Sequence, residues 1–373
     1  MKSNNVYKER TNIYSTNDSA ITFLLALIVP QILIIIVAMI CSSVFGIPMA
    51  SSDESVKTIE NTYPFVYSLI GGLIPQISFI GVFFYISERR KVNYQKANQI
   101  NFKLNPFILL CVIAIGLVAM FGFSPLINMF DKFTTNLGYK SGTSAIDIST
   151  FWKFFAAIFY IGLLPAICEE LIFRGIITNG LKKYGTWVTI IISAVFFALM
   201  HQNLQQLIYQ LFLGGVMAYI VIKTGSIVYT MILHFFNNFV ILLSSYLSGD
   251  VENTTDYSKV WNVIYPILLV IVAVAAIVGL LFLIKYLAER SKKTKNIEVE
   301  TEQTQTDGGN NLKTEKVEVQ ITKPEEKGAL EVKEETLQDN QPNEKFYKNI
   351  YLIIAFAGGL LFWLFAIISS FVK

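Results

Sequence analysis

The chain has 373 residues, of which 53% are hydrophobic, 14% are aromatic and only 15% are charged. A soluble globular domain carries about a quarter of its residues as charged side chains, so this composition excludes an ordinary soluble protein. The formal net charge of +3 reflects lysines and arginines that flank apolar runs, which excludes a basic nucleic-acid-binding face.

Nine apolar runs approach the roughly 20 residues that a helix needs to cross the hydrocarbon core of a bilayer. The sequence therefore predicts an all-α fold, a polytopic transmembrane helix bundle of eight spans plus a tethered C-terminal helix. The first run is too long for a secretion signal and is expected to be a membrane anchor. The predicted spans cover residues 20–44, 63–86, 106–123, 151–178, 186–201, 204–222, 227–247, 260–284 and 350–372.

Basic residues collect in alternate loops, which predicts the orientation of the spans. The N-terminus and the loops after spans two, four, six and eight are expected to face the cytoplasm of a multi-pass cell-membrane protein, and the ninth span then ends outside. The opposite loops are poorer in basic residues and hold Asp53, Glu54, Glu60, Asp131, Asp147, Asp250, Glu252 and Asp256. The basic residues are Lys2, Lys8, Arg10, Arg89, Arg90, Lys91, Lys96, Lys103, Lys182, Lys183, Lys223, Lys285, Arg290, Lys292, Lys293 and Lys295.

Residues 296–344 lose the apolar pattern and carry 13 acidic against 5 basic side chains. This composition predicts a disordered cytoplasmic linker that tethers the last helix. Five regions follow from these boundaries: N-terminal transmembrane helices at 1–149, a catalytic helix bundle at 150–247, the eighth helix with its basic flank at 248–295, the linker at 296–344, and the C-terminal helix at 345–373.

The three cysteines, Cys41, Cys111 and Cys168, all lie at or inside apolar runs and show no CxxC spacing. They are expected to act as small hydrophobic side chains. Cys168 adjoins Glu169, but a thiol in apolar surroundings is a poor nucleophile without a nearby base or cation.

Span four contains two adjacent carboxylates, Glu169 and Glu170, and one arginine, Arg174. Residues four apart share a helix face, so Glu170 is expected to pair with Arg174, with the acid in the favourable N-terminal place. Glu169 points about a quarter-turn away and is left without that partner. A carboxylate held out of water in this way suits a general base.

The only two histidines of the chain, His201 and His234, lie in apolar runs, where buried polar groups are costly and usually functional. Gly185 is the midpoint between Glu169 and His201, so two antiparallel helices folded there bring both side chains to one depth, about 24 Å from the turn. Asn238 follows His234 by one helical turn on the same face. Phe197 precedes His201 by one turn and is either ordinary packing or a wall of the pocket.

A base that activates water and donors that stabilise an oxyanion are the minimum equipment for amide hydrolysis. At this point the chain resembles the CAAX-protease and bacteriocin-processing family of intramembrane endopeptidases, also called abortive-infection proteins. The family pattern EExxxR corresponds to residues 169–174, FxxxH to 197–201 and HxxxN to 234–238. The resemblance covers roughly residues 150–245, about a quarter of the chain.

The resemblance implies that Glu169 and His201 activate water while His234 and Asn238 stabilise the oxyanion. Glu170 and Arg174 would hold the helix and tune Glu169. No cofactor is expected, because the chain has no HExxH helix. Zinc is the alternative, since Glu169, His201 and His234 could supply one oxygen and two nitrogens.

The expected substrate is a membrane peptide or a lipidated peptide in the bilayer, and the composition hints at a bacterial plasma membrane. A different class of function is a non-catalytic membrane scaffold that regulates a partner membrane enzyme or sensor kinase, which the long tether would suit. A proton-coupled transporter would also use intramembrane Glu, His and Arg, but the sequence shows no internal repeat to support one.

Overall fold

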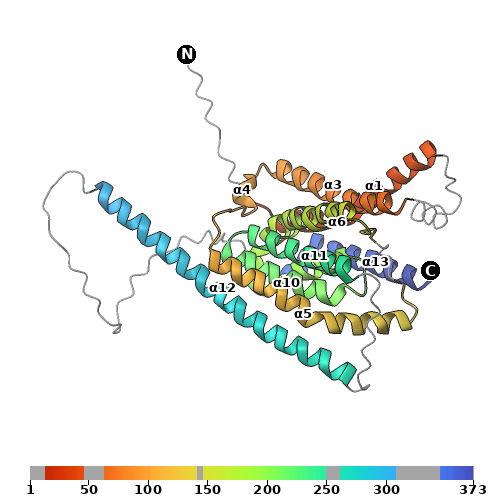
Figure 1. The fold of residues 1–373 in the computed structure, drawn as a ribbon. Coiled ribbons are helices and arrows are strands. Elements are labelled where there is room, and N and C mark those ends of the chain that lie inside the picture. Colours follow the sequence, from red (N-terminus) through yellow and green to blue (C-terminus); the bar gives the residue numbers. More distant parts are fainter. Residues whose placement is uncertain (1–12, 46–62, 141–145, 249–260, 308–344, 373) are drawn as a thin grey trace, which may run out of the picture.

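The computed structural model describes residues 13–45, 63–140, 146–248, 261–307 and 345–372, and these residues form helices and no β-strand. The predicted all-α bundle is therefore confirmed for the described residues. Figure 1 shows the helices lying side by side, with the long α12 running obliquely along one side. The helical elements are α1 (Thr16–Phe45), α3 (Pro64–Arg90), α4 (Tyr94–Ala97), α5 (Pro106–Asn136), α6 (Phe151–Ala157), η1 (Ile158–Leu163), α7 (Leu164–Glu170), η2 (Leu171–Ile177), α8 (Thr178–Leu181), η3 (Lys182–Tyr184), α9 (Thr186–Met200), α10 (Leu207–Thr224), α11 (Val228–Ser248), α12 (Trp261–Asp307), η4 (Phe346–Lys348) and α13 (Ile350–Val372).

Eight described helical segments are long and apolar enough to cross a membrane, so the chain is a multi-pass membrane protein. The predicted span at 186–201 differs, because α9 has 15 residues. Its rise is about 22 Å, shorter than the roughly 30 Å hydrocarbon core. α9 therefore lies within the bundle as a short helix, and its last turn leads into His201.

Span four is a composite helix rather than the single α-helix expected. Two π-helical segments, η1 and η2, interrupt it on either side of α7. A π-helical turn replaces the usual i→i+4 backbone hydrogen bonds with i→i+5 bonds, and such turns are frequent at functional sites. Nearby side chains bond to η2 carbonyls: the Thr178 hydroxyl donates to the Phe173 oxygen at 2.8 Å, and the Asn179 amide donates to the Gly175 oxygen at 2.6 Å.

The eighth helix is longer than its apolar run predicted. α12 continues through Asp307, so residues 296–307 of the predicted linker are helical. The Glu and Gln residues there suit a solvated helix as well as a coil. The rest of the predicted linker, 308–344, and the acidic loop residues at 53–60 and 250–256 lie outside the described residues, as do Lys2, Lys8 and Arg10.

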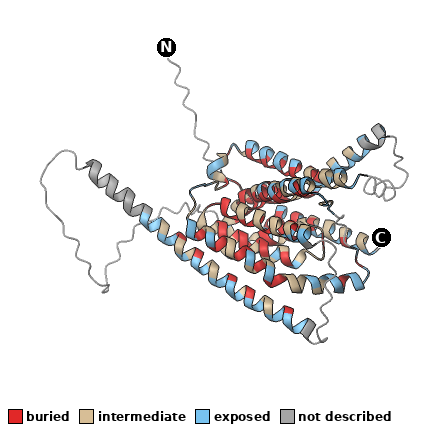
Figure 2. Cartoon of the chain, in the orientation of Figure 1, coloured by how far each residue is buried: buried red, intermediate tan, exposed pale blue. Residues whose placement is uncertain are grey.

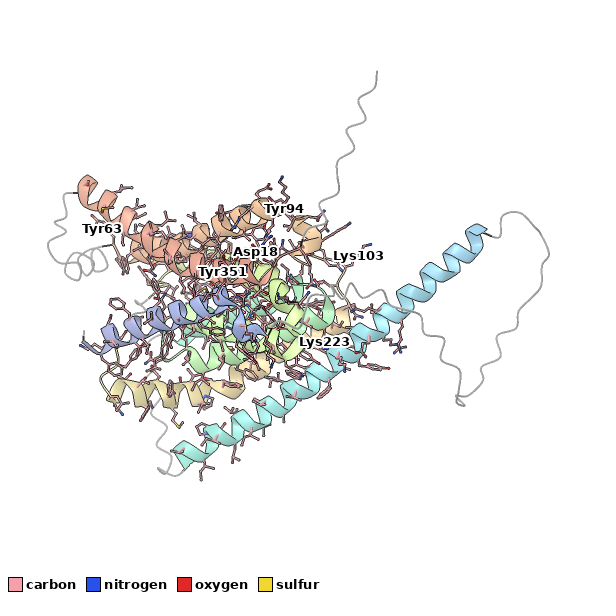
Figure 3. The ribbon with its side chains drawn as sticks, turned by 180° about the vertical axis from the view of Figure 1, so that it is seen from behind. Asp18, Tyr63, Tyr94, Lys103, Lys223 and Tyr351 are labelled. Atoms are coloured by element: carbon pink, nitrogen blue, oxygen red, sulfur yellow. The ribbon has the colours of Figure 1, made fainter. Side chains whose placement is uncertain are left out.

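Basic positions predicted to face the cytoplasm gather at one end of the bundle. Lys103 and Lys223 lie near that end in Figure 3, and Tyr63 lies at the opposite end. A salt bridge of 2.6 Å between Arg90 Nε and the buried Asp18 Oδ2 joins α3 to α1. This clustering agrees with the predicted orientation, while the side of the membrane on which this end lies stays a prediction.

The core lies at the centre of the bundle, where Figure 2 shows most of the buried residues, and α12 is largely exposed. The C-terminal helix α13 is packed into this bundle against α1 and α9. The Phe356 ring lies 4.7 Å from that of Phe196, and the Asn349 amide donates to Asn17 Oδ1 at 3.1 Å. The tethered helix is thus a structural part of the bundle.

Candidate active site

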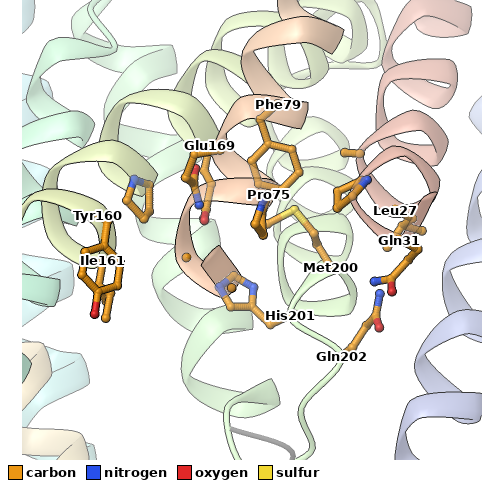
Figure 4. Close-up of a pocket in the computed structure, with 16 residues that line it drawn as sticks. Leu27, Gln31, Pro75, Phe79, Tyr160, Ile161, Glu169, Met200, His201 and Gln202 are labelled. Carbon is orange, nitrogen blue, oxygen red and sulfur yellow. The ribbon is translucent and has the colours of Figure 1, made fainter. Parts of the chain in front are cut away.

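A pocket of about 340 Å³ opens among the helices, and we call it the Glu169 pocket. Its walls come from α1, α3, the composite fourth span and the end of α9, as Figure 4 shows. The predicted catalytic region therefore supplies only part of it, because α1 and α3 belong to the N-terminal helices. The lining residues are Ala26, Leu27, Pro30, Gln31, Gly71, Gly72, Pro75, Gln76, Phe79, Tyr160, Ile161, Pro165, Glu169, Met200, His201 and Gln202.

Glu169 and His201 both line this pocket, so the structure brings together the pair that the turn geometry predicted. Gly185 makes that turn with a φ of 85°, a left-handed value that favours glycine. Glu169 is 8% exposed, and its Oε2 accepts no hydrogen bond from any described residue. The His201 Nδ1 lies 2.8 Å from the Phe197 carbonyl oxygen, which leaves Nε2 as the nitrogen for chemistry.

The predicted pair of Glu170 and Arg174 is present, fully buried, at 2.8 Å between Oε1 and Nη1. The arginine also donates to the Gly214 carbonyl oxygen at 3.3 Å, which links span four to α10. The same Glu170 oxygen lies 3.1 Å from His234 Nδ1. One carboxylate thus joins three elements, and it orients the imidazole that faces Glu169.

His234 presents its second nitrogen to Glu169, with Nε2 at 3.9 Å from Oε2. That separation is too long for a direct hydrogen bond, so neither atom is committed to the other. Asn238 lies one turn further along α11, and its amide donates to the Ile161 carbonyl oxygen at 3.2 Å. Neither His234 nor Asn238 is a lining residue of the Glu169 pocket, although their direct contacts, Glu169 and Ile161, are.

Phe197 packs beneath the polar cluster instead of walling the pocket. It is fully buried and is not a lining residue. The Arg174 guanidinium carbon lies 4.4 Å from its ring centroid, and the His201 and His234 ring centroids lie at 4.8 and 5.9 Å. One aromatic ring thus fixes the relative places of the cation and both imidazoles.

A zinc site would require Glu169, His201 and His234 to lie together as one ligand set. No three His, Cys, Asp or Glu residues in the described part of the chain group as metal ligands, so Glu169, His201 and His234 do not form the three-ligand set as they stand. The buried Cys168 thiol is free and does not line the pocket.

Several polar residues near the site were not singled out from the sequence. Gln31, Gln76 and Gln202 line the pocket, and Gln202 has a φ of 49°, which is unfavourable for a non-glycine residue. The Tyr209 hydroxyl donates to the Oδ1 of Asn237, the residue before Asn238, at 2.5 Å. The sequence could have indicated Gln76, because burying a glutamine inside a predicted membrane span costs free energy and such residues are often functional.

The part of the chain that holds this site matches one known protein family. Residues 151–240 match the family described as type II CAAX prenyl endopeptidase Rce1-like. These residues form an Rce1-like domain. The match confirms, for residues 151–240, the resemblance drawn from the three motifs. No curated protein and no solved structure matches the chain.

All seven residues of the three motifs lie inside the Rce1-like domain, together with the ion pair and the Phe197 packing that hold them. The α1 and α3 walls of the Glu169 pocket lie outside it. The domain therefore contains the seven motif residues, and the N-terminal helices supply much of the remaining pocket lining.

Proposed function

We propose that this chain hydrolyses a peptide bond in a membrane-embedded or lipidated peptide, with Glu169 as the general base. One observation carries the proposal: Glu169 lines a pocket together with His201, and its buried Oε2 has no hydrogen-bond partner among the described residues. Buried polar atoms are almost always bonded, so an exception in a pocket indicates a group kept ready for a ligand or water.

In the proposed mechanism, a water molecule binds between the Glu169 carboxylate and His201 Nε2. Glu169 takes a proton from this water while the oxygen attacks the carbonyl carbon of the substrate. The C=O π electrons move to the oxygen and form a tetrahedral oxyanion. The proton on Glu169 then passes to the leaving nitrogen as the C–N bond breaks, which yields a carboxylic acid and an amine.

His234 and Asn238 are proposed to stabilise the oxyanion. Each has one nitrogen donor that is not used in its contacts with the protein. Asn238 uses one amide N–H for the Ile161 carbonyl and has a second N–H to donate. His234 is held through Nδ1 by Glu170, and its Nε2 is not committed to a hydrogen bond. Donors fixed before reaction in a water-poor site stabilise developing charge most effectively.

The proposed substrate class follows from the family and from the place of the pocket. The Rce1-like family is named for cleavage of prenylated CAAX sequences, and the Glu169 pocket lies among membrane-spanning helices. We propose a peptide whose cleavage site is held at the membrane by a lipid or by its own span. The purified protein is expected to cleave a synthetic peptide that carries a farnesylated cysteine followed by three residues.

The test compares Glu169→Gln with Glu289→Gln, the same chemical change at an exposed position on α12. The first variant should insert and fold but lose cleavage by at least about 100-fold, as loss of a general base does. The second should retain wild-type cleavage. In host cells, comparison of membrane and secreted peptide termini from null, wild-type and Glu169→Gln strains identifies the natural substrate. Full rescue of the null phenotype by Glu169→Gln would favour the scaffold function.

A metal requirement is tested by adding 1,10-phenanthroline to the cleavage assay. Since no step of the proposed mechanism uses a metal, the rate should not change. Inhibition that zinc reverses would replace the glutamate-based mechanism by a metal-assisted one.

A further inference from the structure

We propose that the α3 wall of the Glu169 pocket is a binding site for the extended backbone of the substrate peptide, formed by Gln76 and the Gly71 carbonyl. This inference rests on the proposed function, because it names how the same pocket holds its peptide. Both residues lie outside the Rce1-like domain.

Gln76 is a buried amide without a protein partner for its oxygen. The residue is 6% exposed, lines the pocket, and its Oε1 accepts no hydrogen bond from any described residue. An unpaired amide in an apolar bundle costs about 1 to 3 kcal/mol. A ligand that donates to it would remove that cost, and a peptide N–H is such a donor.

Three prolines add acceptors around the same pocket. Pro30, Pro75 and Pro165 line it, and each lies four residues after another lining residue: Ala26, Gly71 and Ile161. A proline has no N–H, so each of these three carbonyls lacks the donor that an α-helix would supply.

The structure shows how one of these carbonyls is satisfied from outside its helix. The Ile161 oxygen accepts the Asn238 amide at 3.2 Å. Gly71 lines the pocket from α3, and a Cβ placed on Gly71 would meet nothing within 4 Å. Bare backbone next to open pocket space is the feature that lets another backbone approach closely.

Gly71 and Gln76 are five residues apart on α3, about 1.4 helical turns, and the rise of about 7.5 Å between them along the helix axis is similar to the two-residue repeat of an extended peptide. One strand-like segment can therefore donate one N–H to the Gly71 carbonyl and another to Gln76 Oε1. The Gln76 amide nitrogen can also donate to a peptide carbonyl, because the side chain is both donor and acceptor. Backbone recognition of this kind selects an unfolded segment and reads little side-chain sequence.

The first test uses Gln76→Leu, which keeps the size and removes both hydrogen-bonding groups. With the farnesylated peptide as probe, KM should rise about 3- to 10-fold, the effect of one or two lost hydrogen bonds, while kcat changes less. Ser78→Ala is the matched control, since Ser78 is buried on the same helix and bonds its own Ile74 carbonyl. Its KM should stay at the wild-type value.

Esters in the probe identify the partner atom. Replacing single backbone N–H groups near the cleavage site by ester oxygens should raise the wild-type KM at the contacting position. In Gln76→Leu, the ester at that position should not raise KM further, because the side chain that accepts the hydrogen bond is already missing. Equal ester effects in wild type and Gln76→Leu would overturn the inference.

The Gly71 carbonyl is tested by Pro75→Ala, which restores an N–H that can bond it within α3. Folding should be preserved and KM should rise about 3- to 10-fold. Pro125→Ala in α5 is the control, because Pro125 also lies inside a membrane helix but outside the pocket. A KM for Pro75→Ala equal to that for Pro125→Ala would overturn the role of this carbonyl.

A binding measurement separates this inference from the proposed function. The dye-labelled probe is titrated into Glu169→Gln and into Glu169→Gln with Gln76→Leu, and the Kd is read from fluorescence anisotropy. If wild type fails to cleave a probe that it binds, the proposed hydrolysis fails, while a weaker Kd for the double variant still supports the α3 wall. Cleavage by wild type with equal Kd values for both variants would overturn the α3 wall alone. Absence of both cleavage and binding would overturn both for lipidated peptides.

Discussion

Removing the Arg174 guanidinium should be strongly destabilising, because it leaves a fully buried carboxylate. Arg174 and Glu170 are both 0% exposed, and their pair at 2.8 Å is extended by the Gly214 carbonyl and the Phe197 ring. Breaking a buried ion pair from one side costs about 3 to 5 kcal/mol. His234 still contacts the same Glu170 oxygen at 3.1 Å, which places the expectation for Arg174→Met at the lower end, about 3 kcal/mol.

The double variant Glu170→Gln with Arg174→Met isolates the cause of that loss. Removing both charges abolishes the uncompensated carboxylate, and the new amide can still bond His234. The double variant should therefore recover much of the stability and lose less than about 2 kcal/mol relative to wild type. Arg290→Met, at an exposed position on α12, should change stability by less than about 0.5 kcal/mol.

Unfolding by sodium dodecyl sulfate in mixed micelles, followed by circular dichroism, measures these free energies under one condition. The decisive comparison is between the single and the double variant. If the double variant is as unstable as Arg174→Met, the loss comes from packing around the arginine stem, and the argument from buried charge is refuted.

Three further outcomes follow from contacts elsewhere. Gly180→Ala places a Cβ against the carbonyl oxygen of Ser15, the residue before α1, and overpacking there should cost about 1 to 3 kcal/mol in the same unfolding assay. Tyr209→Phe leaves the buried Asn237 oxygen without its donor and should cost about 1 to 3 kcal/mol. The hydrogen bond from Lys153 lowers the pKa of Asp147, so this contact stabilises the fold above the ordinary carboxyl pKa and is lost as pH falls through the lowered value.

Each of these outcomes has a matched comparison. Gly279→Ala, in α12, adds the same methyl group where nothing lies within 4 Å, and should be neutral or stabilising. Tyr286→Phe removes a hydroxyl from an exposed position and should be neutral. Asp147→Asn should lose under about 1 kcal/mol at pH 7, and its difference from wild type should vanish at low pH. A difference that grows on acidification would contradict the assigned sign.

The sequence by itself determined the helical membrane architecture and two of the pairings in the candidate site. Apolar run length locates spans because a bilayer sets the length of a helix that crosses it, and all nine runs became helices. The pairing of Glu170 with Arg174 also followed from spacing, because it depends on local helix geometry alone. The turn at Gly185 brought Glu169 and His201 to one pocket for the same reason.

Only the tertiary structure decided what surrounds these groups. The share of α1 and α3 in the pocket, the single Glu170 oxygen that holds both Arg174 and His234, and the Asn238 bond to Ile161 join residues far apart in sequence. The helical start of the predicted linker and the short α9 also differed from expectation, since hydropathy marks apolar length and not where a helix stops. Long-range contacts between helices depend on packing, which periodicity along one helix does not encode.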